Sequence, residues 1–197
     1  GVATLLASVV VDPEGRVLHR ESIAGRDLAR LITETTRVRA LKQRKGHVLA
    51  GDRRLSRVRE HHLYSAGHQL IAMACRYGAE IVLFQDPGAR KSPRFLPYRH
   101  LRRLAEILIQ LAAEAGLPAP RERKIYGSWS TCTRCGWCPG DPVRQEQIEA
   151  GQCPGCAMTH APEYHLAHLL ALDTLRLQIP AQSRPKLGAY VRQLNAR

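Results

Sequence analysis

Apolar and polar positions change period along the chain, and the first pattern predicts a β-hairpin over residues 3–23. Residues 3–11 (Ala-Thr-Leu-Leu-Ala-Ser-Val-Val-Val) are apolar and rich in β-branched side chains. Asp12-Pro13-Glu14-Gly15 has turn chemistry, because proline presets φ and glycine tolerates a positive φ. Residues 16–23 then form the returning strand.

Apolar residues next recur every three or four positions, which predicts amphipathic helices. The expected helices begin at Asp27 and continue with residues 52–76, 98–115 and 162–178. The apolar face of the 52–76 helix comprises Leu55, Val58, His62, Leu63, Ala66, Leu70, Met73 and Ala74. The face of the 98–115 helix comprises Leu101, Leu104, Ile107, Leu108 and Leu111.

Two further segments predict strands. Residues 79–86, bounded by Gly78 and by Pro87-Gly88, are typical of a buried strand, and residues 123–126 are a candidate final strand. Residues after Pro180 carry Pro, Ser, Arg and Lys and indicate a mobile or accessory tail. The order of elements predicts a mixed α/β domain with a small ribbon inserted before the last helix.

Charge narrows the class of partner. The 197 residues include 30 Lys and Arg against 17 Asp and Glu, so the formal charge is +13 and the pI is near 10.1. Such an excess favours a polyanionic partner, and nucleic acid before an anionic membrane surface. No apolar run approaches the roughly 20 residues that span a bilayer. The 44% of apolar residues is enough to bury a core, which argues against global disorder.

Much of the positive charge lies in two clusters. They comprise Arg37, Arg39, Lys42, Arg44 and Lys45, then, after a break at Gly46, Arg53, Arg54, Arg57 and Arg59. A charge run is usually a solvated helix face. Here Asp52 is the only acidic residue between Arg44 and Arg59, and this one-sided sign favours contacts with phosphates.

Five of the six cysteines lie between positions 132 and 156. The pairs Cys132-x-x-Cys135 and Cys153-x-x-Cys156 have the spacing of a tetrahedral zinc site, and four thiolates would close it, as in structural sites. Cys138 and His160 also have ligand spacing, and either one is an alternative to a member of this set. We expect a structural Zn²⁺ held by Cys132, Cys135, Cys153 and Cys156.

Cysteine pairs of this kind argue against a disulfide framework and predict a reducing compartment. The start of the chain, residues 1–6, lacks the basic region and the cleavage site of a signal peptide. We therefore expect a cytoplasmic protein. Because the chain begins with Gly1 rather than Met, we also expect it to be a piece of a longer polypeptide.

Four segments in succession resemble a known nuclease domain. They are residues 81–86 (Ile-Val-Leu-Phe-Gln-Asp), 126–136 (Tyr-Gly-Ser-Trp-Ser-Thr-Cys-Thr-Arg-Cys-Gly), 153–156 (Cys-Pro-Gly-Cys) and 164–168 (Tyr-His-Leu-Ala-His). Together with the basic helices, they look like the RuvC domain and zinc ribbon of TnpB-like transposon proteins and type V CRISPR effectors, and the resemblance covers most of residues 1–175. It implies a prokaryotic protein with an RNase H-like mixed sheet flanked by helices. The implied divisions are a RuvC-like core with basic helices (1–126), a zinc ribbon (127–160), a final helix (161–179) and a tail (180–197).

In that family three carboxylates hold two Mg²⁺ ions for phosphodiester hydrolysis, and this sequence departs from the pattern at each of them. The family's first Asp precedes a Gly-Val that matches Gly1-Val2, so it lies outside the chain. The Glu position falls on Gln85, an amide, and the last Asp position falls on Glu163, one methylene longer. Asp86 offers a carboxylate, but successive strand residues point to opposite faces. The resemblance thus implies a degenerate site with weak or absent Mg²⁺ binding.

The resemblance implies the RuvC-like portion of an RNA-guided DNA-binding protein. It would bind guide RNA and target DNA with absent or strongly reduced cleavage, and the rest of a longer polypeptide or a companion chain would carry the recognition lobe. Two alternatives stay open. One is an active Mg²⁺-dependent DNA endonuclease that uses the Asp outside the chain, Glu163, and either Asp86 or a water in place of the charge that Gln85 lacks. The other is an unguided zinc-ribbon module that binds nucleic acid directly. Without the resemblance, Gln85 and Glu163 would be ordinary polar residues with no common site.

Overall fold

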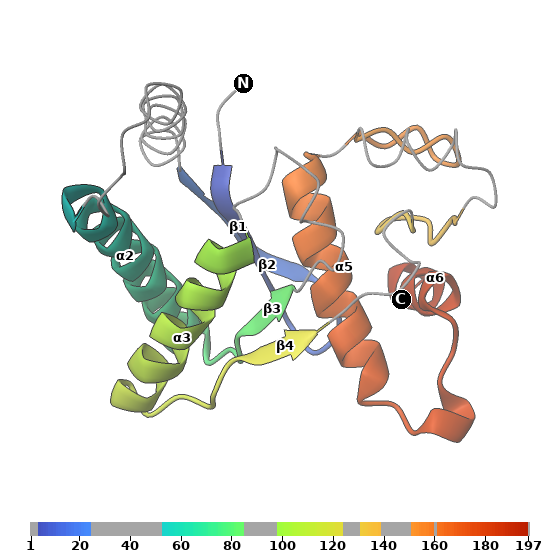
Figure 1. Ribbon diagram of the computed structural model, residues 1–197. Helices are drawn as coiled ribbons and strands as arrows, with labels where there is room; N and C mark the ends of the chain where they lie inside the picture. The colour runs from blue at the N-terminus through green and yellow to red at the C-terminus, as the bar shows by residue number, and fades with distance from the viewer. Residues whose placement is uncertain are drawn as a thin grey trace. The chain divides into compact units, whose positions relative to one another are not determined.

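The computed structural model describes residues 4–24, 53–84, 98–123, 131–138, 151–159 and 161–196. Its strands are β1 (Thr4–Val11), β2 (Val17–Ala24), β3 (Val82–Phe84) and β4 (Arg121–Arg123), and its helices are α2 (Arg53–Tyr77), α3 (Tyr98–Glu114), α5 (Pro162–Leu177) and α6 (Leu187–Asn195), as Figure 1 shows. The fold is therefore mixed α/β, as the sequence predicted. The chain forms two compact units, the first containing α2 and α3 and the second containing β3, β4, α5 and α6.

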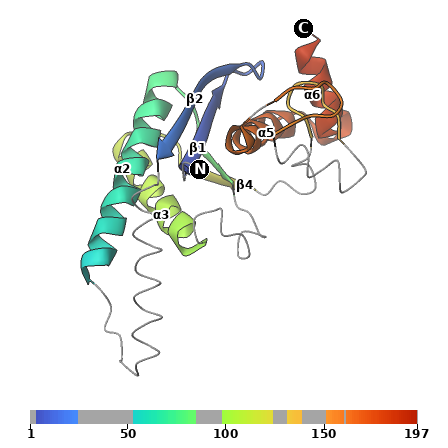
Figure 2. The same cartoon turned by 90° about the horizontal axis from the view of Figure 1, so that it is seen from above.

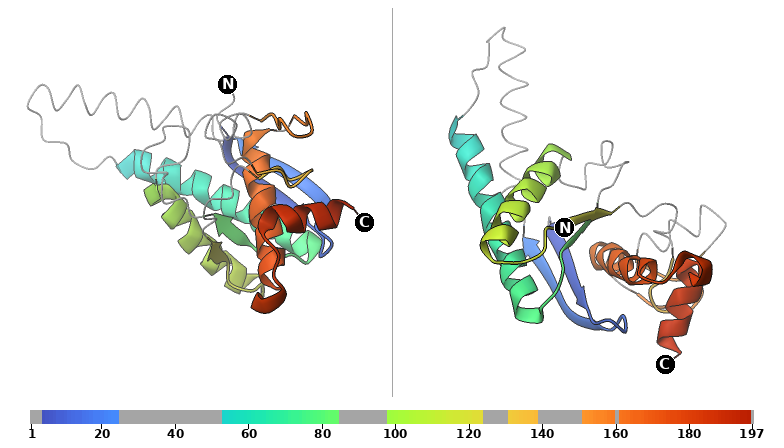
Figure 3. Two further views of the ribbon diagram at one scale, coloured as in Figure 1. Left: turned by 90° about the vertical axis from the view of Figure 1, so that its right-hand side faces the viewer. Right: turned by 90° about the horizontal axis from the view of Figure 1, so that it is seen from below.

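The predicted hairpin is present, with bounds within one residue of those expected (Figure 3). Its turn closes where Asp12 N–H donates to the Arg16 carbonyl at 3.0 Å and Gly15 N–H donates to the Asp12 carbonyl at 2.9 Å. The Asp12 carboxylate also accepts the Arg16 N–H at 2.7 Å. Gly15 has φ +81°, a conformation that glycine adopts at low cost.

Helices α2 and α3 of the first unit pack against each other along the predicted apolar faces (Figure 2). The buried members are Leu63, Ala66, Leu70, Met73 and Ala74 on α2 and Leu104, Ile107, Leu108 and Leu111 on α3. The helices approach closely at Gly67, where a Cβ atom would lie 3.0 Å from Leu111 Cδ1. The Glu60 carboxylate binds the Arg103 guanidinium across this interface, and Glu106 binds it along α3, which together raise the pKa of Arg103.

Strands β3 and β4 are parallel, with Val82 opposite Arg121 and Phe84 opposite Arg123. The prediction of a strand after residue 79 is confirmed for residues 82–84, whereas β4 begins two residues before the expected strand. Among the described residues the strands form two separate two-stranded sheets. The single mixed sheet that the family resemblance implies is therefore not shown.

Helix α5 confirms the helix predicted over residues 162–178, and Pro162 lies in its first turn, where no backbone N–H is needed. Its buried residues Leu169, Leu170 and Leu172 form one cluster with Leu187 and Val191 of α6, and Val82 of β3 packs against this cluster. A strand and two helices of the second unit thus share a core.

The segment after Pro180, expected to be mobile or accessory, folds as the short 3₁₀ turn η1 (Ala181–Ser183) and α6. The mobile interpretation is wrong because Leu187, Tyr190 and Val191 recur at helical spacing and are buried. The Arg184 guanidinium donates to the carbonyls of Leu177, the last residue of α5, and of Ile179 just beyond it, at 3.0–3.1 Å.

Candidate metal centre and basic surface

The first cysteine turn, residues 131–138, is closed by its own backbone. Cys132 N–H donates to the Trp137 carbonyl at 2.9 Å, and Gly136 N–H donates to the Cys132 carbonyl at 2.9 Å. Arg134 N–H points at Cys132 Sγ from 3.4 Å. Gly136, directly after the second cysteine, has φ +64°. These bonds bring the two cysteines of the pair together at one end of the turn.

The second cysteine turn, residues 151–159, has the same backbone plan. Cys153 N–H donates to the Met158 carbonyl at 2.9 Å, again five residues ahead. Gln152 and Thr159 form an antiparallel bridge that closes its ends. Ala157 follows the second cysteine and has φ +53°, as Gly136 does in the first turn. The backbones of the two turns therefore hold their cysteine side chains in the same arrangement.

The four predicted cysteines form one cluster, in which every Sγ atom lies within 4.8 Å of the others. Cys132 Sγ lies 3.8 Å from Cys156 Sγ, and Cys135 Sγ lies 3.7 Å from Cys153 Sγ. A tetrahedral ion with Zn–S bonds of about 2.3 Å separates its ligands by about 3.8 Å. A disulfide would need about 2.05 Å, and all four cysteines are free. The cluster can hold a metal ion, and its geometry is consistent with a structural zinc.

The environment of the sulfurs also fits a cation. Burial raises the pKa of Cys132 to about 12 and raises the pKa of Cys135. Burial also acts against the Cys156 thiolate, but the hydrogen bond from the Met158 backbone and the neighbouring thiols lower its pKa overall. Crowded thiolates of this kind are stabilised by a bound cation, so metal binding displaces protons.

The structure treats the two alternative ligands, Cys138 and His160, differently. Cys138 is exposed and is not a member of the cluster. His160 lies outside the described residues. The preferred ligand set is therefore the one that the structure brings together.

The contact between α6 and the first cysteine turn was not predicted from the sequence. Gly188 lies against Gly136, with no room for a Cβ atom on either residue, because it would meet the other's carbonyl oxygen. Arg192 Nη1 donates to the Gly136 carbonyl at 3.1 Å, and Asn195 Nδ2 donates to the Thr133 carbonyl at 3.3 Å. Gly188, Arg192 and Asn195 share one helix face at positions i, i+4 and i+7, but this spacing does not identify the segment that the face contacts.

The expected catalytic positions are described only in part. Gln85 and Asp86 lie outside the described residues, directly after β3 ends at Phe84. Glu163 is the second residue of α5, and its side chain is not described. Because Val82 packs against the α5 cluster, the strand before Gln85 and the helix that carries Glu163 are neighbours.

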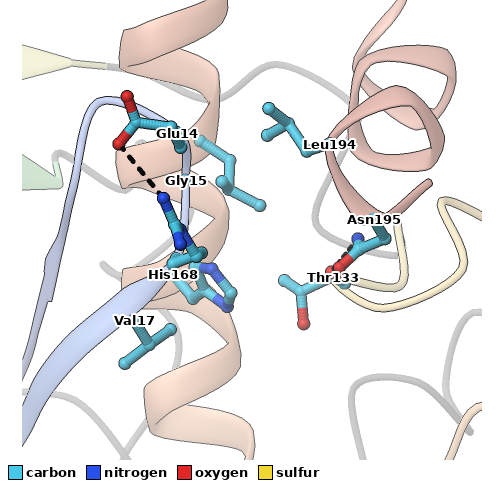
Figure 4. A pocket seen from close by; sticks show the side chains of 9 residues that line it. Glu14, Gly15, Val17, Thr133, His168, Leu194 and Asn195 are labelled. Carbon is cyan, nitrogen blue, oxygen red and sulfur yellow. Dashed lines mark hydrogen bonds and ion pairs between the residues drawn. The ribbon is translucent and has the colours of Figure 1, made fainter. Parts of the chain in front are cut away.

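A cavity of about 180 Å³ lies in the second unit, between the hairpin turn and the first cysteine turn (Figure 4). Its lining comprises Glu14, Gly15, Arg16, Val17, Thr133, His168, Leu172, Leu194 and Asn195. His168 reaches it from α5, and burial lowers the pKa of this histidine despite a hydrogen bond with the Gly15 backbone. The described residues that line this cavity include none of the positions expected to be catalytic.

The two basic clusters fall largely outside the described part of the chain. Arg37, Arg39, Lys42, Arg44 and Lys45 lie outside it, and Arg53 and Arg54 open α2 with side chains that are not described. Arg57 on α2 is exposed and forms no ion pair with a described residue. Arg59 donates to the Ser56 hydroxyl at 3.2 Å. Within the ranges that the structure describes, no helix has both the length and the apolar character needed to cross a membrane.

Comparison with known proteins assigns no family. No protein-family model matches the chain, and no curated protein matches it significantly.

Proposed function

We propose that this chain is a zinc-stabilised nucleic-acid-binding protein, the RuvC-like portion of an RNA-guided DNA-binding protein. The observation that carries the proposal is the four-cysteine cluster, which comes directly before α5 in a chain of charge +13. A closed ligand set and a large positive charge together are typical of a module that folds around a metal and binds a polyanion.

Zinc suits the cluster better than magnesium or calcium does. Four sulfur donors at tetrahedral spacing favour Zn²⁺, because Mg²⁺ and Ca²⁺ prefer oxygen ligands. All four positions are filled by protein, which leaves none for water or substrate. The zinc is therefore structural, and it stabilises the fold rather than taking part in a reaction.

The element order supports an RNase H-like core. A hairpin, a helix, a strand, a helix and a strand precede the cysteine turns, and α5 follows them, as the resemblance to RuvC domains implies. Gln85 directly follows β3, and Glu163 lies in the first turn of α5, which packs against β3. One carboxylate and one amide give less negative charge than two Mg²⁺ ions require. The proposed protein therefore binds nucleic acid with absent or strongly reduced cleavage.

Positive charge provides the binding surface. In this proposal Arg57 and its basic neighbours contact phosphates, while base pairing with a guide RNA reads the target sequence. Each phosphate contact releases counterions, so affinity depends steeply on salt.

Binding of a labelled RNA–DNA heteroduplex to the full-length protein tests this function. Affinity should fall more than tenfold between about 50 and 200 mM salt. The variant R53Q/R54Q/R57Q should bind at least tenfold more weakly. The control variant R16Q/R102Q removes two exposed arginines that already pair with Asp12, Glu14 or Glu106, and it should bind like the wild type. Affinity that is independent of salt would contradict the proposal.

Two further measurements address the alternative functions. Cleavage products that appear with Mg²⁺ or Mn²⁺ and vanish in Glu163→Ala would show an active endonuclease. Equal binding of double-stranded DNA with and without co-purified RNA would show an unguided module. The proposal expects no products and guide-dependent binding.

Metal analysis tests the zinc. The purified wild type should carry one zinc per chain, and Cys153→Ser should lose it. Cys138→Ser is the matched control, since Cys138 lies outside the cluster, and it should keep the metal. A stably folded preparation without zinc would rule out the structural role.

A further inference from the structure

The two hydrogen bonds from α6 to the first cysteine turn fall on two particular peptide groups. Asn195 donates to the Thr133 carbonyl, and the same peptide group carries Arg134 N–H, which points at Cys132 Sγ. Arg192 donates to the Gly136 carbonyl, and that peptide group carries Trp137 N–H, which bonds to the Cys135 thiol. Each donor on α6 is thus linked, through one peptide plane, to one metal-binding sulfur.

A planar peptide group transmits such a contact in two ways. A donor on the carbonyl oxygen fixes the plane, and so fixes the direction of the N–H on its other side. It also polarises the amide, which strengthens the N–H···S bond in a chain of hydrogen bonds. Groups that orient metal ligands from outside the ligand set change metal affinity by about 10- to 100-fold.

The helix is seated closely enough for this linkage. Gly188 and Gly136 meet backbone to backbone, so a side chain on either residue would separate α6 from the turn. Leu187 and Val191 anchor the other side of α6 on the α5 cluster. The same helix therefore contacts the core of the second unit on one face and the cysteine turn on another.

We propose that α6 is a metal-linked clamp, in which Arg192 and Asn195 are positioning residues that orient the N–H groups aimed at Cys132 and Cys135. Zinc binding and the docking of α6 then stabilise each other by the same factor, because coupling between two binding equilibria is reciprocal. This inference rests on the proposed zinc site. It adds a coupling by which the occupancy of that site changes the stability of α6 docking.

Competition with a chromophoric zinc chelator tests the first half of the linkage. The variant R192M/N195A should bind zinc at least tenfold more weakly than the wild type. Arg192→Lys keeps a charged donor and should lose less affinity than Arg192→Met. Gln193→Ala is the matched control. Gln193 is exposed and lies between Arg192 and Asn195 in the sequence, and the variant should bind zinc as tightly as the wild type.

Two readouts separate positioning from a general loss of stability. With Co²⁺ in place of zinc, R192M/N195A should shift the thiolate-to-metal charge-transfer band to longer wavelength, since weaker N–H···S bonds leave the sulfurs more electron-rich. In the wild type, chelation should abolish the hydrogen-exchange protection of α6 amides while that of α3 amides in the first unit stays unchanged.

The outcomes distinguish this inference from the proposed function. A wild-type chain that binds no zinc would contradict the zinc site itself. Zinc bound by the wild type and by R192M/N195A with affinities within twofold, or α6 protection that survives chelation, would overturn the clamp and leave the zinc site standing.

Discussion

The two cysteine turns have the same backbone design but differ in what surrounds them. In each turn the first cysteine donates to a carbonyl five residues ahead, and a residue with positive φ follows the second cysteine. In the first turn that residue is Gly136, which lies against α6. In the second turn it is Ala157, which is exposed.

This difference separates two reasons for glycine at such a position. Ala157 shows that the turn tolerates a Cβ atom, at a cost of about 1 kcal/mol for the left-handed conformation. Gly136 is required for another reason, because its Cβ would meet the Gly188 carbonyl oxygen. Packing against the C-terminal helix, rather than the cysteine turn itself, demands the glycine.

Gly136→Ala should have the largest effect. It combines a left-handed alanine with an overlap against the Gly188 carbonyl, so we expect a loss of about 3 kcal/mol or more. For a chain of this size that lowers Tm by about 6 to 12 °C. Thermal unfolding of the zinc-loaded protein, followed by circular dichroism, measures it.

Gly116→Ala is its control. Gly116 has φ +68°, like Gly136, but a Cβ atom there would meet nothing within 4 Å. It should cost only about 1 kcal/mol. Equal losses in the two variants would show that the contact with α6 contributes nothing.

Trp137→Ala should have the next largest effect. Trp137 packs against the cysteine cluster, and its ring lies over Gly155, so it connects the two turns. Because the side chain is only half-buried, we expect a loss of about 2 kcal/mol, less than for a fully buried Trp. Trp137→Phe should recover most of the loss in chemical denaturation. A loss as large as that of Gly136→Ala would show that the Trp137 contact contributes as much stability as the packing of α6 against the first turn.

Gly155→Ala should have a smaller effect. Its Cβ would lie 3.0 Å from Trp137 Cγ, close enough that the indole must move by a few tenths of an ångström. Such overpacking costs about 1 kcal/mol. In the Trp137→Ala background the cost should disappear, and a double-mutant cycle measures this coupling. Additive losses would show that the Trp137 ring is not what makes a larger side chain at position 155 unfavourable.

Ala157→Gly should give the smallest change and the opposite sign. Glycine removes the left-handed strain but increases the entropy of the unfolded chain, which leaves a gain of about 0.5 kcal/mol. The midpoint of chemical denaturation should rise slightly, with zinc content unchanged. A loss of stability would mean that the Ala157 methyl group makes a favourable contact.

Local patterns predicted the parts of the fold that depend on neighbouring residues. The period of the apolar residues located α2, α3 and α5 to within one or two residues, and Asp12 to Gly15 located the hairpin turn. The spacing of Cys132, Cys135, Cys153 and Cys156 was enough to predict that these four cysteines cluster, because each pair is closed by its own backbone.

Contacts between distant segments could not be predicted in this way. The charged segment Arg121–Arg123 has no apolar signal, since its pairing with β3 is made by backbone atoms. Helix α6 is nine residues long and follows a stretch rich in proline and charge, so the helical spacing of its three buried residues did not outweigh the composition of the tail. The roles of Gln85, Asp86 and Glu163 stay predictions that depend on the family resemblance.

The arginines around the end of α5 affect the number of ions that a titration with a polyanion will show to be displaced. Arg176 binds Asp173 and the Pro185 carbonyl, and Arg184 binds the carbonyls of Leu177 and Ile179. A guanidinium engaged in this way has fewer N–H groups left for an incoming anion. The ions displaced from a bound polymer should therefore number well below the 30 cationic side chains. Part of the chain's positive charge thus stabilises the fold itself, through hydrogen bonds that join one segment to another.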